Sequence, residues 1–288
     1  MSAILATDNQ SITANVTLLA DNCSAGSVSG KITDAVSGAN VDNASISVRS
    51  GLNVTSGITT GTTTTATNGT YTLSSMNAGG YTVQASKSGY ITSFISVNVC
   101  GNITNQNTNI SELLNAESMR IVVHWAADSG VSILDSHITG PDNSSGRFHI
   151  YWNASTALTR YQDPDNFYYH TNAYQCNSCT SAQASDNVTL DRDDMDGAPG
   201  TETITITNIR NGTYRYSVQD YTNRNNASSR KLADSGTTVT AYYNNTEIPF
   251  NLPNSVGNLW VVFTFNGETG VFTTQDNITS HANYDTIQ

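Results

Sequence analysis

The sequence predicts an all-β protein built from two β-sandwich domains, and three observations support this fold class. Apolar residues make up 37% and charged residues 12% of the 288 positions. The polar remainder is rich in Ser, Thr and Asn, which disfavours helices and favours strands joined by turns. Short runs of alternating polar and apolar residues recur between Gly- and Asn-containing turns, a pattern that is typical of sandwiches.

Residues 1–22 are expected to form a polar tail that contains one alternating run, SITANVTLLA. Ile12, Ala14, Val16 and Leu18 fall on one face of this run, because successive side chains of a strand point to opposite faces. Such a strand can add to an exposed sheet edge. Pairing with the chain's own domain would give a monomer, whereas pairing with a neighbouring subunit would give a head-to-tail filament.

Residues 23–100 are expected to form the first sandwich, with the strands SVSGKIT, NASISVRS, GTYTLSS, GYTVQAS and ITSFISVNV. Tyr71 and Leu73 share one face of the third run, and Tyr81 and Val83 share one face of the fourth. The segment Asn77–Gly80 between these runs predicts a hairpin turn. Residues 101–117 are polar and turn-rich, and predict a linker.

The first domain resembles a carboxypeptidase regulatory-like domain. The matching elements are Gly30, Asp34, Gly38, the Asn68-Gly69-Tyr71 turn, Gly80-Tyr81 and Gly89-Tyr90. The resemblance implies a transthyretin-like sandwich of seven strands. Modules of this family accompany peptidases without being catalytic, and they recur as spacers in cell-surface and secreted proteins.

Residues 118–288 are expected to form the second sandwich and a C-terminal tail. Its predicted strands include MRIVVHW, RFHIYW, ETITITNI, GTYRYSVQDY, TTVTAYY, TEIPFNL and LWVVFTF. This part resembles a poorly characterised family of extracellular β-sandwich domains through Leu134-Asp135-Ser136-His137, Gly140-Pro141, Phe148–Tyr151, Leu190–Asp194, Glu202–Ile206 and Gly212–Tyr216. It departs from that family at Ile133, where the family often has another Asp.

Asn-x-Ser/Thr triplets are spread over the whole chain. They begin at Asn9, Asn15, Asn22, Asn43, Asn53, Asn68, Asn102, Asn109, Asn143, Asn153, Asn187, Asn211, Asn226, Asn244 and Asn277. Composition alone would produce about half of them. The excess predicts an extracellular chain, secreted or at the cell surface, that carries covalent N-glycans on its loops.

The four cysteines fit an oxidising compartment. Cys23 and Cys100 bracket the first domain, while Cys176 and Cys179 lie in a Ser- and Asn-containing loop. Three pairings are possible, and proximity in the sequence favours Cys23–Cys100 and Cys176–Cys179. A metal or redox role for the CxxC pair is the alternative, but there is no second pair at zinc-finger spacing and no βαβ pattern.

Charge and hydropathy exclude two classes of partner. The net charge of −11 disfavours nucleic-acid binding. No run of 18 apolar residues could span a membrane as a helix. Export requires a signal, yet MSAILATDNQ has neither a basic start nor an apolar core. We therefore expect that a leader has been removed or that the sequence begins inside a longer precursor.

No arrangement of residues predicts an enzyme. The five histidines are His124, His137, His149, His170 and His281, and they form neither HxxE nor HExxH. GxSxG and P-loop motifs are absent as well. We therefore predict no catalytic residues.

The densest group of chemically active side chains is LDRDDMDG, which holds Asp191, Asp193, Asp194 and Asp196. Clustered carboxylates favour a hard cation, so these residues, together with Asp135 if the fold brings it near, are candidate Ca²⁺ ligands, although no cofactor is required. The register is not that of an EF-hand, because Met195 stands where an oxygen ligand is needed. A solvated acidic loop is the alternative interpretation.

The sequence therefore favours a structural subunit of an extracellular glycosylated filament, a homopolymer that assembles by N-terminal strand addition. A secreted carbohydrate-binding or adhesin module is the alternative. Trp125, Trp152, Trp260 and the pairs Tyr168-Tyr169 and Tyr242-Tyr243 could stack on sugars, although strand tryptophans are more often core residues.

Overall fold

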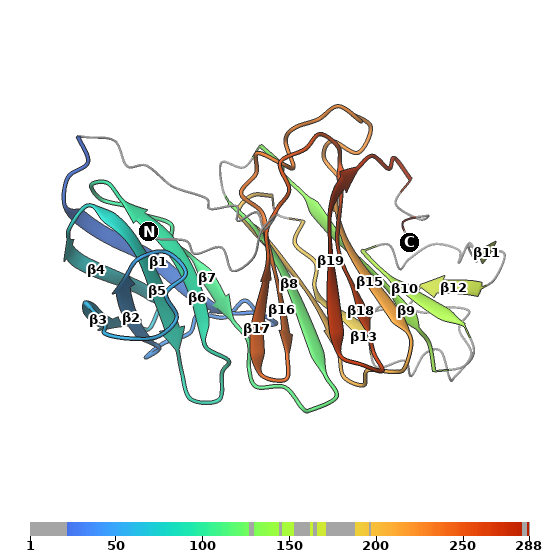
Figure 1. Ribbon diagram of the computed structural model, residues 1–288, viewed down its shortest axis with the longest axis horizontal. Helices are drawn as coiled ribbons and strands as arrows, with labels where there is room; N and C mark the ends of the chain where they lie inside the picture. Colours follow the sequence, from blue (N-terminus) through green and yellow to red (C-terminus); the bar gives the residue numbers. More distant parts are fainter. Residues whose placement is uncertain are drawn as a thin grey trace, which may run out of the picture. The chain divides into compact units, whose positions relative to one another are not determined.

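The computed structural model describes residues 22–126, 130–143, 146–152, 162–163, 166–170, 188–195, 197–283 and 287, with only the backbone course for 162–163 and 166–170. These residues form strands in four sheets and contain no α-helix (Figure 1). The predicted all-β fold is confirmed.

Seven strands lie in the described residues before 118. They are β1 (Gly26–Asp34), β2 (Ser45–Ser50), β3 (Gly61–Thr64), β4 (Thr70–Met76), β5 (Gly79–Ser86), β6 (Ser93–Val99) and β7 (Thr108–Ile110).

Twelve strands lie in the later described residues. They are β8 (Met119–Trp125), β9 (Leu134–Pro141), β10 (Arg147–Ile150), β11 (Gln162–Asp163), β12 (Asn166–His170), β13 (Val188–Arg192), β14 (Gly200–Ile206), β15 (Thr213–Asp220), β16 (Thr238–Tyr243), β17 (Thr246–Phe250), β18 (Leu259–Asn266) and β19 (Val271–Thr279).

The chain divides into two compact units. Unit 1 comprises the described residues up to Ile32, together with Asp42–Ala85 and Phe94–Thr108. Unit 2 comprises Thr33–Val41, Ser86–Ser93 and the described residues from Asn109 onward. Two sandwiches were expected, with boundaries at 100 and 118, whereas the observed division assigns two short segments of the first region to unit 2.

Unit 1 is built on a sheet of order β4-β1-β7 and a sheet of order β3-β2-β5-β6. These are the seven strands that the resemblance implied. Tyr71 and Leu73 are buried at 3% and 4% exposure, so the alternation in β4 identified the core face. The predicted disulfide between Cys23 and Cys100 is present, with a Cα–Cα distance of 4.5 Å.

Two expectations for this region are wrong. Asn77–Gly80 does not close a hairpin, because β4 and β5 belong to different sheets and the short link carries the chain from one sheet to the other. Residues 101–117 are not merely a linker. Ser29 donates its backbone N–H to the carbonyl of Ile103 at 2.9 Å, and β7 completes the sheet beside β1.

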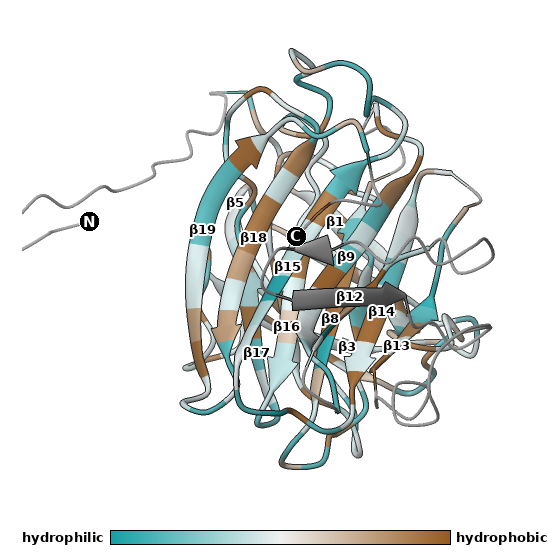
Figure 2. Cartoon of the chain, turned by 90° about the vertical axis from the view of Figure 1, so that its right-hand side faces the viewer, coloured by the Kyte–Doolittle hydropathy of each residue, from teal (hydrophilic) through white to brown (hydrophobic). Residues whose placement is uncertain are grey.

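Unit 2 packs a sheet of order β11-β12-β10-β9-β15-β18-β19 against a sheet of order β13-β14-β8-β16-β17. Figure 2 shows the longer sheet with β19 at its edge. The core between the sheets is strongly aromatic, and Trp125, Trp260, Tyr214, Tyr216 and Phe263 are all fully buried. Burial of such large rings stabilises this unit.

The ends of several strands meet at one end of the unit 2 sandwich. Strand β9 runs antiparallel to β10 and β15, so its first residues lie beside the last residues of those strands. The register pairs Asp135 with Gln219, just before β15 ends at Asp220. The end of β13 and the start of β14 come from the opposite sheet. This convergence positions the side chains of the candidate site.

Candidate functional site: an acidic pocket with aromatic walls

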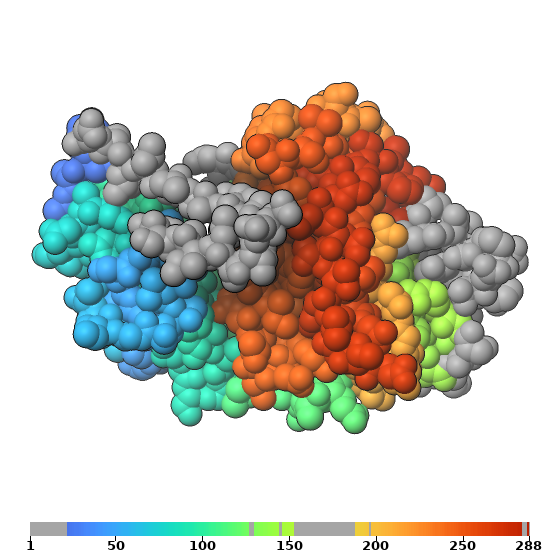
Figure 3. Space-filling model, in the orientation of Figure 1, coloured from blue at the N-terminus to red at the C-terminus, as the bar shows by residue number. Residues whose placement is uncertain are grey.

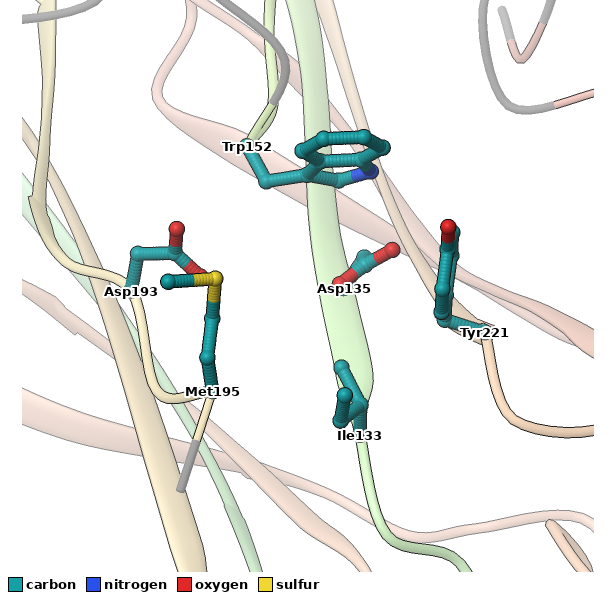
Figure 4. Close-up of a pocket in the computed structure, with 6 residues that line it drawn as sticks. All are labelled: Ile133, Asp135, Trp152, Asp193, Met195 and Tyr221. Atoms are coloured by element: carbon teal, nitrogen blue, oxygen red, sulfur yellow. The ribbon is translucent and has the colours of Figure 1, made fainter. Parts of the chain in front are cut away.

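A pocket of about 100 Å³ opens at this end of unit 2. Its lining is Ile133, Asp135, Trp152, Asp193, Met195 and Tyr221. Figure 4 shows the Asp135 carboxyl group between the ring of Trp152, the ring of Tyr221, and the Asp193 and Met195 side chains. The rings of Trp152 and Tyr221 meet edge to face, with centroids 5.6 Å apart and an interplanar angle of 79°. The pocket is therefore largely apolar, with acidic groups at defined points.

Asp135 is the most buried acid of the lining. It is 2% exposed, and its Oδ2 atom has no hydrogen-bond partner. Burial raises the pKa of Asp135 well above its usual range, and the charges of Asp193 and Asp220 add to this effect, while the Arg224 guanidinium opposes it. An unpartnered carboxylate oxygen inside a protein is costly, so this group has a strong tendency to acquire a proton or a cation.

Glu202 lies behind Asp135 and enters from the other sheet. It shares a face of β14 with Ile204 and Ile206, so the backbone directs it into the core. Its Oε2 accepts a hydrogen bond from the backbone N–H of Ser136 at 2.6 Å. Along β9, pairing with β10 begins at Ile138, so the Ser136 N–H lies before the stretch paired with β10. The Glu202 carboxylate accepts the hydrogen bond of this N–H.

The second carboxyl oxygen of Glu202, Oε1, has no hydrogen-bond partner. It is buried, because the residue is only 1% exposed. Burial raises the pKa of Glu202 well above its usual range, and Asp135 and Asp193 raise it further. Sequence reasoning missed Glu202, but its signal was present: in ETITITNI this acid occupies the same register as the isoleucines.

The remaining charges lie around this pair. Asp193 is exposed at the mouth, and partial loss of water raises its pKa. Asp220 is fully buried, and its two oxygens accept hydrogen bonds from the backbone and the side chain of Asn223 at 3.0 and 2.8 Å. Arg224 stacks on Tyr221, with its Cζ 3.8 Å from the ring centroid, and donates to the Tyr221 carbonyl.

The predicted group of five aspartates is brought together only in part. Asp135 and Asp193 meet at the pocket. Asp191 instead accepts hydrogen bonds from Thr189 at 2.6 Å and from Thr205. Asp194 forms an ion pair with Arg192 at 3.0 Å, and Asp196 lies outside the described residues. In the described part of the chain, no three His, Cys, Asp or Glu side chains are gathered as metal ligands, and a Ca²⁺ site stays a prediction.

The aromatic residues proposed for sugar stacking do not lie together: some are in the core, and one lines the pocket. Trp125 and Trp260 are fully buried and Tyr242 is 2% exposed, so these rings belong to the interior. Tyr243 packs edge to face on Phe265 at 5.2 Å. The side chains of Tyr168 and Tyr169 are outside the described residues. Trp152 is the member of this set that lines the pocket.

A histidine pair was not anticipated from the sequence. Nδ1 of His137 lies 3.0 Å from Nε2 of His149, and both residues are buried on adjacent strands. Tyr151 stacks on His149 at 4.5 Å. The alternation of these residues in β9 and β10 could have shown that they share a sheet face, although the register between the strands was not readable.

Most of the described sequon asparagines lie at the surface. The exposed ones are Asn22, Asn43, Asn53, Asn68, Asn102, Asn211, Asn226, Asn244 and Asn277. Asn143 is half-buried. Asn109 is buried at 8% exposure and its Nδ2 lies 3.4 Å from Thr201 Oγ1, so a glycan does not fit this position in the fold. Asn9, Asn15, Asn153, Asn187, Cys176, Cys179 and the run Ile12–Leu18 lie outside the described residues.

Residues 27–111 match the model of the carboxypeptidase regulatory-like domain family. The resemblance of the first sandwich to this family is therefore confirmed, and the matched domain type is regulatory-like rather than catalytic. No curated protein sequence matches the chain. Among the described residues, no helix has the length and apolar character needed to cross a membrane.

Solved structures show distant likeness. The minor pilin GBS52 of Streptococcus agalactiae is 13% identical, with a TM-score of 0.24 over 32% of this chain, which spans 47% of that pilin. The major pilin SpaD of Corynebacterium diphtheriae is 11% identical, with a TM-score of 0.25 over 78% of this chain and 63% of that one.

A third structure, a DUF3823 family protein of Bacteroides uniformis, is 8% identical, with a TM-score of 0.26 over 68% of this chain and 90% of that one. Similarity at this level carries no argument about function.

Proposed function

We propose that this chain is a structural subunit of an extracellular filament, and that a strand from residues 10–20 of one subunit adds to the edge of β19 in the next. The observation that carries this proposal is β19 itself. It spans nine residues and is the longest edge strand of the four sheets in the described residues. It pairs with β18 on one side, and nothing in the described chain pairs with its other side.

The exposed part of β19 is suited to accept a strand. Val271 is 56% exposed, and Thr273, Thr274 and Gln275 are also exposed. Figure 3 shows the red segment of the chain that contains β19 at the surface. From Val271 to Thr274 the register with β18 is regular, and the irregularity follows only after Thr274. Natural edge strands are usually protected by Pro, Lys or a bulge, and Val271–Thr274 carries none of these.

Other edges are less suitable. Strand β17 contains Pro249, which cannot donate a backbone hydrogen bond. Strand β13 is shorter, and its last residues, Asp191 and Arg192, are held in side-chain contacts. Strands β3 and β7 span four and three residues. Strands β4 and β6 are also sheet edges, but each spans seven residues, so β19 is the longest edge available to the run SITANVTLLA.

The donor and the acceptor are different segments of the chain, so their contact would be heterologous. Such a contact propagates into a filament when the rotation between subunits does not close a ring. Ile12, Ala14, Val16 and Leu18 would face the protein, while backbone hydrogen bonds would supply affinity. Glycans on the exposed sequons would limit sideways association. Export is consistent with the Cys23–Cys100 disulfide.

The test compares three variants by analytical ultracentrifugation and electron microscopy. Deletion of residues 1–20 is expected to leave folded monomers that form no fibres. Thr273→Lys places a charge on the acceptor edge and is expected to weaken assembly about tenfold or more. Asn225→Lys adds the same charge on an exposed turn outside the Val271–Thr274 edge and should assemble as the unmodified chain does. Fibres from the truncated chain would refute the proposal.

A further inference from the structure

The pocket around Asp135 is small, which limits what can enter it. Its volume of about 100 Å³ is smaller than the roughly 150 Å³ cavity that accommodates benzene in an engineered protein. It corresponds to about three water molecules at liquid density. A ligand of a few heavy atoms fits, whereas a complete sugar ring would have to remain mostly outside.

The residues that line the pocket suit a ligand that has both an apolar part and a charged part. Ile133, Trp152, Met195 and Tyr221 supply the walls, and Asp135 and Asp193 supply the charge. A calcium ion takes six to eight oxygen ligands, and this lining does not offer them. An organic cation has both parts that the lining calls for: a charged group for the carboxylates and alkyl groups for the walls.

The buried carboxyl groups give the pocket a need that either a proton or a cation can meet. Asp135 Oδ2 and Glu202 Oε1 are both buried and unpartnered. Asp193 lies at the pocket mouth, and each oxygen of Asp220 already accepts a hydrogen bond from Asn223. Arg224 is the nearby cation of the described chain that acts on Asp135, but its guanidinium lies over the Tyr221 ring and donates to the Tyr221 carbonyl.

The aromatic rings add a second attraction for a cation. Trp152 and Tyr221 form a corner whose planes differ by 79° (Figure 4). The negative face of an aromatic ring attracts ammonium groups, and Trp is the strongest partner of this kind. Quaternary and alkylated ammonium ligands are commonly held in such aromatic surroundings.

We propose that this pocket binds a small alkylammonium ion, with the ammonium group against Asp135 and the alkyl part against Trp152, Tyr221 and Ile133. This site is independent of strand addition at β19. Met195 is 70% exposed at the mouth and can pack over a bound ligand.

Calorimetric titration of the full-length protein tests the proposal with four matched probes. n-Butylammonium represents a primary ammonium such as a lysine side chain, and tetramethylammonium represents a quaternary one. Butan-1-ol has the same alkyl chain without the charge, and calcium chloride supplies charge without carbon. We expect saturable binding of at least one ammonium probe, with affinity at least about tenfold above that of butan-1-ol. The preferred probe identifies the primary or quaternary class.

Two variants locate the binding. Asp135→Asn keeps the shape but removes the charge, and we expect it to weaken ammonium binding about tenfold or more. Trp152→Leu should weaken it by a smaller factor. Glu268→Gln removes an exposed charge from the turn before β19 and should leave binding unchanged. Far-UV circular dichroism verifies that each variant is folded.

Three results would overturn the proposal. They are equal binding of butan-1-ol and the ammonium ions, binding that is insensitive to both Asp135→Asn and Trp152→Leu, and Asp135-dependent calcium binding with no response to either ammonium ion.

Discussion

The buried hydroxyl of Thr82 in unit 1 and the buried carboxylates of Asp135 and Glu202 in unit 2 are in opposite situations. Thr82 is 1% exposed; it donates to the Gly51 carbonyl at 2.7 Å and accepts from the Val54 N–H at 2.8 Å. The two carboxylates are equally inaccessible, yet each has one oxygen without a partner. In unit 1 the buried polar group fastens a loop to a strand, whereas in unit 2 the buried acids reduce stability at a pocket.

The two units also differ in how they are held together. Unit 1 closes a long loop with a disulfide, whereas unit 2 relies on a large aromatic core. A small sandwich gains much from a covalent closure, and a larger core can tolerate an unfavourable group. Stability lost around ligand-binding residues is a common feature of functional sites. We therefore interpret unit 1 as scaffold and the open end of unit 2 as a binding region.

The largest expected effect comes from the disulfide. The double change Cys23→Ser and Cys100→Ser opens a loop with a sequence separation of 77, and should cost unit 1 about 4 kcal/mol. Hydrogen exchange measured strand by strand would show faster opening of β1, β2 and β4. The three tryptophans, Trp125, Trp152 and Trp260, all lie in unit 2, so fluorescence should report a smaller shift. Equal shifts in both readouts would mean that the two units unfold together.

A smaller change in the free energy of unfolding, opposite in sign, is expected when Glu202 is replaced. Burial raises its pKa and that of Asp135 above the values of 4.5 and 3.8 that apply to the free side chains. The folded chain thus holds these protons to higher pH than the unfolded chain. Their stabilising contribution is present at low pH and is lost as pH rises through the folded pKa.

Glu202→Gln should therefore stabilise unit 2 by about 1–3 kcal/mol at pH 8, because it removes the buried charge while an amide oxygen can still accept from Ser136. The difference from the unmodified chain should shrink toward pH 4. Urea unfolding followed by tryptophan fluorescence measures both quantities, with Glu268→Gln as the control. Destabilisation at pH 8 would show that the Glu202 charge is compensated in the folded chain.

The smallest change in stability is expected at Thr82, whose hydroxyl group both donates and accepts a hydrogen bond. Thr82→Val removes two hydrogen bonds while keeping the shape, and should destabilise unit 1 by about 1 kcal/mol. Thr72→Val changes an exposed threonine of β4 and serves as a comparison. The signs of the Thr82 and Glu202 effects should differ. If both substitutions stabilise the protein, the contrast between the two units fails.

The fold was largely predictable because alternation exposes a half-buried strand. The run in β4 was recognisable because apolar and polar side chains separate onto two faces, whereas β8 and β18 were recognisable as short, almost continuous apolar runs. Strand β9, LDSHITGP, was not, since it is buried almost throughout and its polar residues give no alternating signal. Strand β19, VFTTQDNIT, was missed for the opposite reason, because an exposed edge strand needs few apolar residues.

The candidate site was predictable only in outline. The approach of Asp135 to Asp193 was expected from their acidity, but Glu202 enters from a different sheet and Tyr221 from the end of β15. Sequence spacing does not show which strand ends meet, because the strand order was unknown. The partners that hold Asp191 and Asp194 away from the pocket depend on the same register.

Hydrogen exchange at β19 tests the central claim, strand addition between subunits, most directly. The amides of Val271–Thr274 should exchange slowly in concentrated intact protein, faster on dilution, and fastest after deletion of residues 1–20. Dependence on concentration separates addition between chains from pairing within one chain. Exchange at these amides that is the same at all concentrations and unaffected by the deletion would contradict the account.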